Sequence, residues 1–145
     1  MSDEGHDPTL HDRRAGRMNE LALSGRCCTQ IMVQMALDEA GAENPQMVDA
    51  VGALCLGMFA GHTCGALSGA ALAMALRSSG PLDGALVKEL VEWFADEFGS
   101  LDCDDILGGD PMRRFVTCPP LVSRTYEEAM DLLAAHGRLA PRRVG

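Results

Sequence analysis

The sequence is poor in lysine and in aromatic side chains, and it lacks the short cysteine motifs of common metal and haem sites. One lysine and eleven arginines stand against 21 acidic residues, which gives a net charge of −9. Phosphate binding needs a basic face, so this balance excludes DNA, RNA and an anionic membrane surface as expected partners. No CxxC or CxxCH occurs among the six cysteines, which excludes a zinc knuckle, a thioredoxin motif and covalently attached haem.

Alternation of apolar and polar residues, the pattern of strands, is also absent. Apolar residues make up 47% of the 145 residues, yet only six residues are aromatic, so small and unbranched side chains carry the bulk. Such side chains favour closely packed helices over sheet. We therefore predict an all-α fold, a single-domain bundle of five or six helices, and its small-residue surfaces predict a homodimer.

Both ends of the chain are polar. The acidic start MSDEGHDPTLHD lacks the pattern of a signal peptide and predicts a disordered leader over residues 1–16. The basic GRLAPRRVG predicts a loose tail over 137–145, which leaves 17–136 as the helical domain. A cytoplasmic location follows. In that reducing compartment six cysteines indicate catalytic, redox-sensing or metal-binding roles rather than structural disulfides.

Periodicity and cap residues place the expected helices. A first helix over 17–40 puts Cys28 on its apolar face and turns Cys27 about 100° away, so these two cysteines are expected to differ in role. Asn44-Pro45 is a start signal for a second helix that continues to Met58. Further helices are expected at 63–78, 83–98, 101–107 and 121–136.

The stretch from Ala50 to Leu76 allows a second interpretation. His62 is its only basic or acidic side chain, and glycine recurs every fourth residue from Gly57 to Gly69, as in some membrane helices. However, the stretch has few Leu, Ile or Phe residues, and the polar HTC at its centre would be costly in lipid. We therefore expect no membrane span, but two short buried helices joined by a tight turn.

The segment HTCGALSG, residues 62–69, is the clearest candidate for chemistry. With Thr63 as N-cap, Cys64 takes the first helical position, where backbone N–H groups and the helix dipole favour a thiolate. Gly65 and Gly69 have no side chains, so a helix, a cofactor or a partner can approach closely. Alternatively, the glycines only permit helix contact and Cys64 is a small buried apolar residue. The residues alone leave both interpretations open.

CGALSG resembles the CGAxxG motif of the C_GCAxxG_C_C family, redox-active proteins of about this length that are named for four cysteines. GRCCTQ resembles the segment with the first family cysteine, which implies Cys28, and CGALSG supplies the second, Cys64. LDCDDILGGD and TCPPLV resemble the segments of the third and fourth cysteines, which implies Cys103 and Cys118. The module is also similar to part of the split-Soret cytochromes c, where it accompanies an iron–sulfur centre.

The resemblance implies a redox function with two possible forms. In one, four thiolates hold an iron–sulfur cluster of an electron carrier or sensor, with zinc less favoured and no haem. In the other, a disulfide exchanges electrons with a redox protein partner, and Cys64 attacks while another family cysteine resolves. Whether there is enzymatic turnover stays open. The implied residues are catalytic Cys64 and Cys28, cofactor-binding Gly65 and Gly69, and metal-binding Cys28, Cys64, Cys103 and Cys118.

A non-enzymatic alternative is a helical binding subunit whose cysteines hold structural zinc or simply pack in the core. Two cysteines fall outside the family set. Cys27 stands where the family has asparagine, and Cys55 is additional. Both are expected to be incidental to function.

Titratable neighbours of the family cysteines have two interpretations each. His62 could act as a base or ligand for Cys64, although a surface turn histidine is the commoner case. Three aspartates around Cys103 would oppose a thiolate there unless a metal balanced the charge. We expect them to be caps and solvated charges: Asp102, Asp104 and Asp105.

Overall fold

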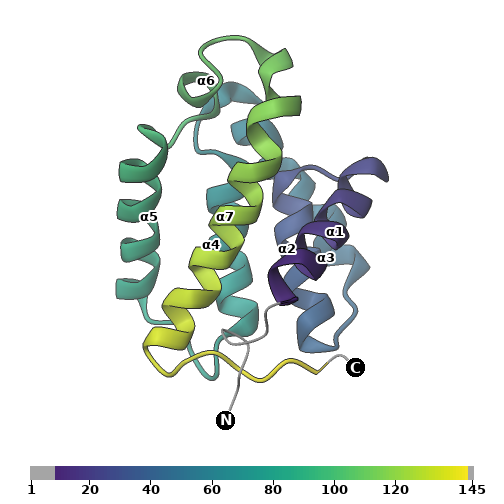
Figure 1. Ribbon diagram of the computed structural model, residues 1–145, viewed down its shortest axis with the longest axis vertical. Helices are drawn as coiled ribbons and strands as arrows, with labels where there is room; N and C mark the ends of the chain where they lie inside the picture. The colour runs from purple at the N-terminus through teal and green to yellow at the C-terminus, as the bar shows by residue number, and fades with distance from the viewer. Residues whose placement is uncertain (1–8, 144–145) are drawn as a thin grey trace.

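Helices α2 (Cys28–Ala40) and α4 (Gly65–Arg77) lie against each other at the centre of the molecule (Figure 1). The computed structural model describes residues 9–143. In it α7 (Arg114–Ala135) packs along α4, and α5 (Gly84–Phe98) stands on the outer side of these two helices. On the opposite side α1 (Leu10–Leu23) packs against α2 and α7.

The shorter elements connect these five helices. They are α3 (Pro45–Ala50), α6 (Cys103–Ile106), the 3-10 helices Val51–Leu54 and Pro111–Arg113, and a π-helical turn, Gly57–Gly61. Within residues 9–143 the only β-type pairing is an isolated bridge between Ser78 and Leu139. The predicted all-α, single-domain bundle is confirmed.

Glycines on α4 let its backbone approach α2 closely. A Cβ on Gly69 would lie 2.9 Å from the Met32 Cβ and 3.0 Å from the Thr29 Cα, and a Cβ on Gly65 would lie 2.7 Å from the Thr29 Oγ1. The Thr29 hydroxyl also donates a hydrogen bond to the Gly65 carbonyl at 3.2 Å. The sequence left open whether a helix, a cofactor or a partner approaches Gly65 and Gly69. In the structure helix α2 fills this space.

Replacing Gly69 by alanine should destabilise the fold. The added Cβ would force Met32 and the α2 backbone to move, and overpacking of this kind costs about 1–3 kcal/mol. The measurement is the free energy of unfolding from chemical denaturation. Gly16→Ala is the matched control, because Gly16 lies inside α1 with nothing within 4 Å of its Cβ position; this variant should gain up to about 1 kcal/mol. Equal effects of the two changes would contradict the packing argument.

The first helix expected from the sequence is two helices. Gly25, at a φ of +96°, turns the chain between α1 and α2. Helix α1 also begins at Leu10, inside the expected leader, because Leu10 and Arg14 are buried against the bundle. Residues 1–8 of that leader lie outside the described residues.

The second expected helix ends at Ala50, although Asn44 caps its start as predicted by accepting from the Met47 N–H at 3.1 Å. After the 3-10 helix the backbone is left-handed at Leu56, Met58 and Phe59, which prevents a helix from continuing. In the described part of the chain, no helix has the length and apolar character needed to cross a membrane.

Helices α4 to α6 lie close to their predicted positions, whereas α7 begins at Arg114 and not near Leu121. Pro119 and Pro120 were interpreted as residues before the last helix, but both lie inside it. They follow an earlier start at the 3-10 turn, where the Asp110 carboxylate accepts from the Met112 N–H at 3.0 Å. The family cysteine beside them therefore lies within a helix and not before one.

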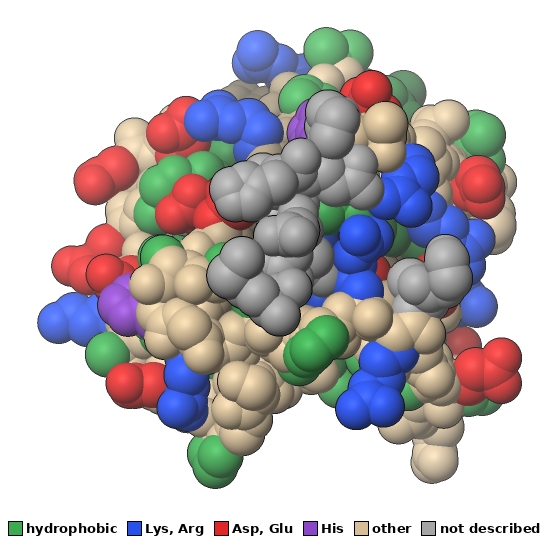
Figure 2. Space-filling view, turned by 60° about the horizontal axis from the view of Figure 1, so that its bottom comes forward, with side chains coloured by type: hydrophobic (Ala, Val, Ile, Leu, Met, Phe, Trp, Pro, Cys, Tyr) green, Lys and Arg blue, Asp and Glu red, His purple; other side chains and the backbone are tan. Residues whose placement is uncertain are grey.

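The C-terminal segment is attached to the bundle as far as Arg143, although a loose tail was expected from residue 137. The Ala140 N–H donates to the Arg77 carbonyl at 2.9 Å, and the Arg143 N–H donates to the Glu39 carbonyl at 2.7 Å. The segment runs beneath the helices in Figure 1. Figure 2 shows this end of the molecule, where basic and acidic side chains are interspersed.

Candidate functional site

Three of the four family cysteines lie at helix starts and the fourth lies in the second turn of a helix, and all four are free thiols. Cys28 begins α2, Cys64 is the N-cap of α4, Cys103 begins α6, and Cys118 lies in the second turn of α7. Their thiols form two hydrogen-bonded pairs, Cys64 with Cys103 and Cys28 with Cys118. The charges of Cys64 and Cys103 also act on Cys28, so the structure brings all four sulfurs into one neighbourhood.

Two hydrogen bonds donated by backbone N–H groups join the start of α4 to the residues before Cys103. The Cys64 N–H donates to the Leu101 carbonyl at 2.6 Å, and the Thr63 N–H donates to the Asp102 carboxylate at 2.8 Å. Thr63 has a φ of +61°, the turn that directs the chain into α4. These contacts place the start of α4 beside the start of α6, although the two cysteines are far apart in sequence.

Cys103 has the more acidic thiol of its pair. The hydrogen bond from the Cys64 thiol lowers the pKa of Cys103 to about 7, and the Gly65 N–H at the start of α4 assists. Partial burial and the charges of Asp104 and Asp102 oppose this shift in pKa. A thiol with this pKa is about half ionised at neutral pH, against a few per cent for an ordinary cysteine.

Cys64 behaves in the opposite way to the sequence-based expectation. Its pKa is raised, first by its hydrogen bond to Cys103 and then by burial, although the N–H groups of Ala66 and Leu67 partly lower it. The helix also starts one residue later than predicted, so Cys64 is the N-cap and only 4% exposed. The start of α4 therefore favours a thiolate, but on Cys103 and not on Cys64.

The second pair repeats this asymmetry. The pKa of Cys28 is raised well above its usual range by its bond to Cys118 and by burial. The same bond lowers the pKa of Cys118, with help from the charge of Arg114. In each pair, therefore, one thiol is an acceptor that ionises readily and the other is a donor with a raised pKa.

Alkylation of the reduced protein by iodoacetamide should report the acidic thiol directly. Only the thiolate reacts, so the rate at Cys103 should rise with pH and reach half its maximum near pH 7. In Cys64→Ala the main donor is lost, and the half-maximum should move toward about 8.5, the value of a free cysteine. Peptide mass spectrometry gives the rate at each cysteine. An unchanged midpoint in Cys64→Ala would contradict the pairing.

Cys27 and Cys55 form a disulfide, with their Cα atoms 5.9 Å apart and a sequence separation of 28. The expectation against structural disulfides is wrong for this pair, whereas the expectation that the two residues are incidental to function stays a prediction. The bond ties the N-cap of α2 to the residue before Leu56, where the left-handed segment begins. The predicted difference in role between Cys27 and Cys28 is confirmed.

The acidic and basic neighbours take mainly local roles. The His62 Nδ1 lies 3.6 Å from the Asp102 carboxylate with its side chain 71% exposed, which is the environment of a surface turn histidine. Asp102 accepts from the Thr63 N–H, and Asp105 accepts from the Ser100 hydroxyl at 2.9 Å. These contacts agree with the prediction of turn-stabilising and solvated carboxylates.

Four thiols in one neighbourhood are the donor set of iron–sulfur and zinc sites. Their arrangement, however, does not fit a metal ion. Within residues 9–143 no three His, Cys, Asp or Glu side chains converge closely enough to hold one. The thiols instead influence each other's pKa most strongly in twos, Cys64 with Cys103 and Cys28 with Cys118, a pairing that suits disulfide formation.

The matched family is consistent with this geometry. A family model described as "Putative redox-active protein (C_GCAxxG_C_C)" matches residues 26–132, a span that contains all six cysteines. Searches of curated proteins and of solved structures return no match. The similarity to part of the split-Soret cytochromes c therefore stays a prediction.

Proposed function

The chain belongs to this family of redox-active proteins, and from that premise we propose that Cys64 and Cys103 are a dithiol that exchanges two electrons with a disulfide. One observation carries the proposal. The buried Cys64 thiol is hydrogen-bonded to the partly exposed, acidic Cys103. An accessible thiolate with a second thiol beside it is the arrangement of thiol–disulfide exchange proteins.

The first step uses Cys103. Its thiolate attacks one sulfur of a partner disulfide, R–S–S–R′, and a Cys103–S–S–R bond forms while the partner's S–S bond breaks. The leaving thiolate R′–S⁻ takes a proton from water. A thiol with a pKa near ambient pH suits this step, because it combines a large thiolate fraction with good nucleophilicity.

The second step uses Cys64, which the first step activates. Once the Cys103 sulfur is in a mixed disulfide, it carries no charge and no longer accepts the Cys64 hydrogen bond. The hydrogen bond and the charge of Cys103, which raise the pKa of Cys64 in the reduced protein, are then gone. The N–H groups of Ala66 and Leu67, which lower it, remain, so the pKa of Cys64 falls. Cys64 then loses its proton to water and attacks the Cys103 sulfur, and R–S⁻ leaves and takes a proton from water. The partner gains two electrons and two protons, and the protein gains the Cys64–Cys103 disulfide.

Cys28, the other residue predicted to be catalytic, belongs to the second pair. We propose the same two-electron chemistry for it, with Cys118 as the nucleophile because its pKa is the lower of the two. The redox protein partner considered from the sequence stays a prediction. The homodimer and the cytoplasmic location stay predictions from the sequence.

An iron–sulfur protein is the second candidate function, and the shared neighbourhood of the four thiols favours it. The pairing of the sulfurs favours exchange over cluster binding. Anaerobic purification followed by a visible spectrum and metal analysis separates the two. A colourless, metal-free protein supports exchange, whereas a brown protein with stoichiometric iron supports the cluster.

Trapping the intermediate of the first step tests the exchange proposal. Cys64→Ser keeps a good N-cap for α4 but removes the resolving thiol, so bis(2-hydroxyethyl) disulfide should leave a stable adduct on Cys103. The reduced wild-type protein should pass through that adduct to an internal disulfide. Peptide mass spectrometry locates the adduct. An adduct on Cys28 or Cys118 with Cys103 unmodified would overturn the assignment.

A further inference from the structure

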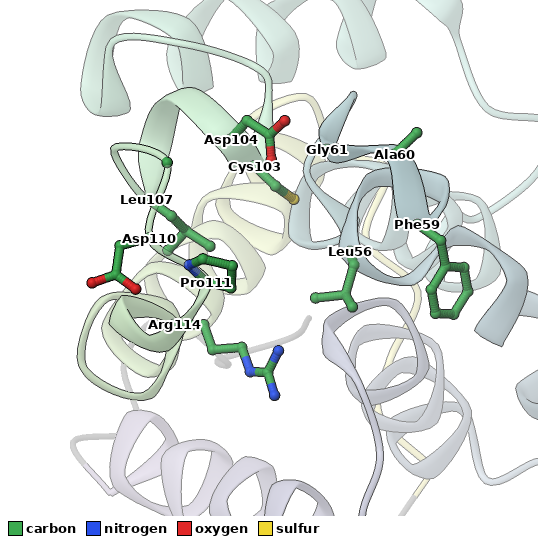
Figure 3. Close-up of a pocket in the computed structure, with 11 residues that line it drawn as sticks. Leu56, Phe59, Ala60, Gly61, Cys103, Asp104, Leu107, Asp110, Pro111 and Arg114 are labelled. Atoms are coloured by element: carbon green, nitrogen blue, oxygen red, sulfur yellow. The ribbon is translucent and has the colours of Figure 1, made fainter.

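A cavity of about 360 Å³ opens beside Cys103 between two loop segments (Figure 3). One wall comes from the left-handed segment after the disulfide and the other from the chain between α6 and α7. The residues that matter here are Leu56, Phe59, Cys103, Leu107, Pro111 and Arg114. A cavity this size takes a small molecule and not a folded domain.

The cavity combines a thiol, a cation and apolar walls. Figure 3 shows the Cys103 sulfur at one end and the Arg114 guanidinium extending toward the open side at the other. Arg114 lies over the Phe115 ring at 4.9 Å from the ring centroid, and it forms no ion pair with any residue between 9 and 143. Leu56, Leu107 and Pro111 lie between the sulfur and the guanidinium.

Two carboxylates also line the cavity, but neither neutralises Arg114. The Asp110 carboxylate accepts from the Met112 N–H at 3.0 Å, and in Figure 3 it points away from Arg114. The Asp104 carboxylate lies against Gly61, at the opposite end of the cavity from Arg114. The Arg114 end, whose charge no carboxylate of the cavity neutralises, therefore presents a positive charge to a ligand.

We propose that this cavity binds low-molecular-weight thiols and disulfides that carry a carboxylate, with the carboxylate on Arg114 and the sulfur at Cys103. A guanidinium offers paired N–H donors that match a carboxylate. The apolar walls would cover the short carbon chain between the two ends. The inference rests on the exchange function proposed above and names the substrate class of the same site. The chemistry is that of the two steps above: the small disulfide is reduced to two thiols while the protein dithiol is oxidised.

Three small disulfides of similar length that differ in charge test this inference. They are 3,3′-dithiodipropionate, which is anionic, bis(2-hydroxyethyl) disulfide, which is neutral, and cystamine, which is cationic. Rates of reaction with the reduced protein are measured at about 0.15 M salt, where screening limits the effect of the net charge of −9. Each rate is divided by the rate of the same disulfide with 2-mercaptoethanol, which removes differences in intrinsic reactivity.

The wild-type protein should prefer the anionic over the neutral disulfide by about tenfold, the size of one charge-assisted contact. Arg114→Gln should abolish this preference. Arg113→Gln is the matched control, because it removes the same charge at the adjacent residue, which does not line the cavity. This variant should keep the preference. The ratio within one protein is independent of how much Cys103 is ionised, so a change in its pKa cannot imitate the result.

A preference for cystamine, or the same anionic-to-neutral ratio in wild type and Arg114→Gln, would overturn the inference. If the neutral disulfide still reacts at Cys103 in that case, the exchange function stands and only the substrate class is wrong. If none of the three disulfides reacts at Cys103 in the folded protein, the exchange function itself is wrong.

Discussion

Replacing Cys103 by serine is expected to lower by about 100-fold at pH 7 the rate at which the Cys64–Cys103 pair cleaves bis(2-hydroxyethyl) disulfide, measured at those two residues by peptide mass spectrometry. A serine hydroxyl does not ionise in this range, so the nucleophile is lost. Cys64, the thiol that remains in this pair, cannot replace it, because its pKa is raised. Each pKa unit above the ambient pH lowers the thiolate fraction about tenfold.

Cys118→Ser is the matched control for that variant. Cys118 also has a lowered pKa and a hydrogen-bonded partner, but it does not line the cavity beside Cys103. We expect its loss to change the rate by no more than about threefold, since the pair that faces the cavity is intact. Far-ultraviolet circular dichroism of both variants confirms that they are folded. A larger loss in Cys118→Ser than in Cys103→Ser would transfer the nucleophile to the second pair.

Replacing Glu39 by alanine is expected to cost about 3–5 kcal/mol of folding free energy, the largest stability effect that the structure predicts. The Glu39 side chain is buried and accepts from Arg14 at 2.6 and 3.0 Å and from the Tyr126 hydroxyl at 2.8 Å. The Arg77 Nε lies 3.6 Å from the same carboxylate. Without Glu39, the buried Arg14 and Arg77 lose the carboxylate that they share, although Arg14 keeps its contact with Glu127 at 2.7 Å. Removing one partner of a buried ion pair is costly because the remaining charge is less well compensated.

Chemical denaturation of Glu39→Ala against Glu43→Ala provides the comparison. Glu43 is an exposed glutamate in the turn after α2, so its removal should change the free energy of unfolding by less than about 0.5 kcal/mol. Glu39 also joins α1, α2, α7 and the C-terminal segment through these side chains and the bond of its carbonyl to Arg143. Equal stability of the two variants would mean that the buried charges do not hold these segments together.

Local signals in the sequence were sufficient for the helices that carry them. Helix α5 was predicted almost to the residue, because Asp83 caps its start and its apolar stripe is regular. Two prolines were interpreted as a helix boundary, and this failed at α7, since the helix starts before them. The break at Gly25 was missed because the apolar positions on either side continue at helical spacing.

The site was only partly predictable, for a physical reason. Motif resemblance identified the four cysteines, but which sulfur contacts which depends on long-range bonds such as Cys64 N–H to the Leu101 carbonyl. The pKa order within a pair depends on those contacts and on burial, so the thiolate was expected on Cys64 and occurs on Cys103. Arg114 gave no signal in the sequence, because its importance comes from the cavity that it lines.

The disulfide map of the oxidised wild-type protein tests the central claim most directly. The protein is equilibrated with mixtures of reduced and oxidised dithiothreitol, free thiols are blocked, and the linked peptides are identified by mass spectrometry. The account predicts a peptide pair joined through Cys64 and Cys103 that appears as the mixture becomes more oxidising. If both cysteines stay blocked as free thiols across the whole range in folded protein, or if either is linked to a different cysteine, the account is contradicted.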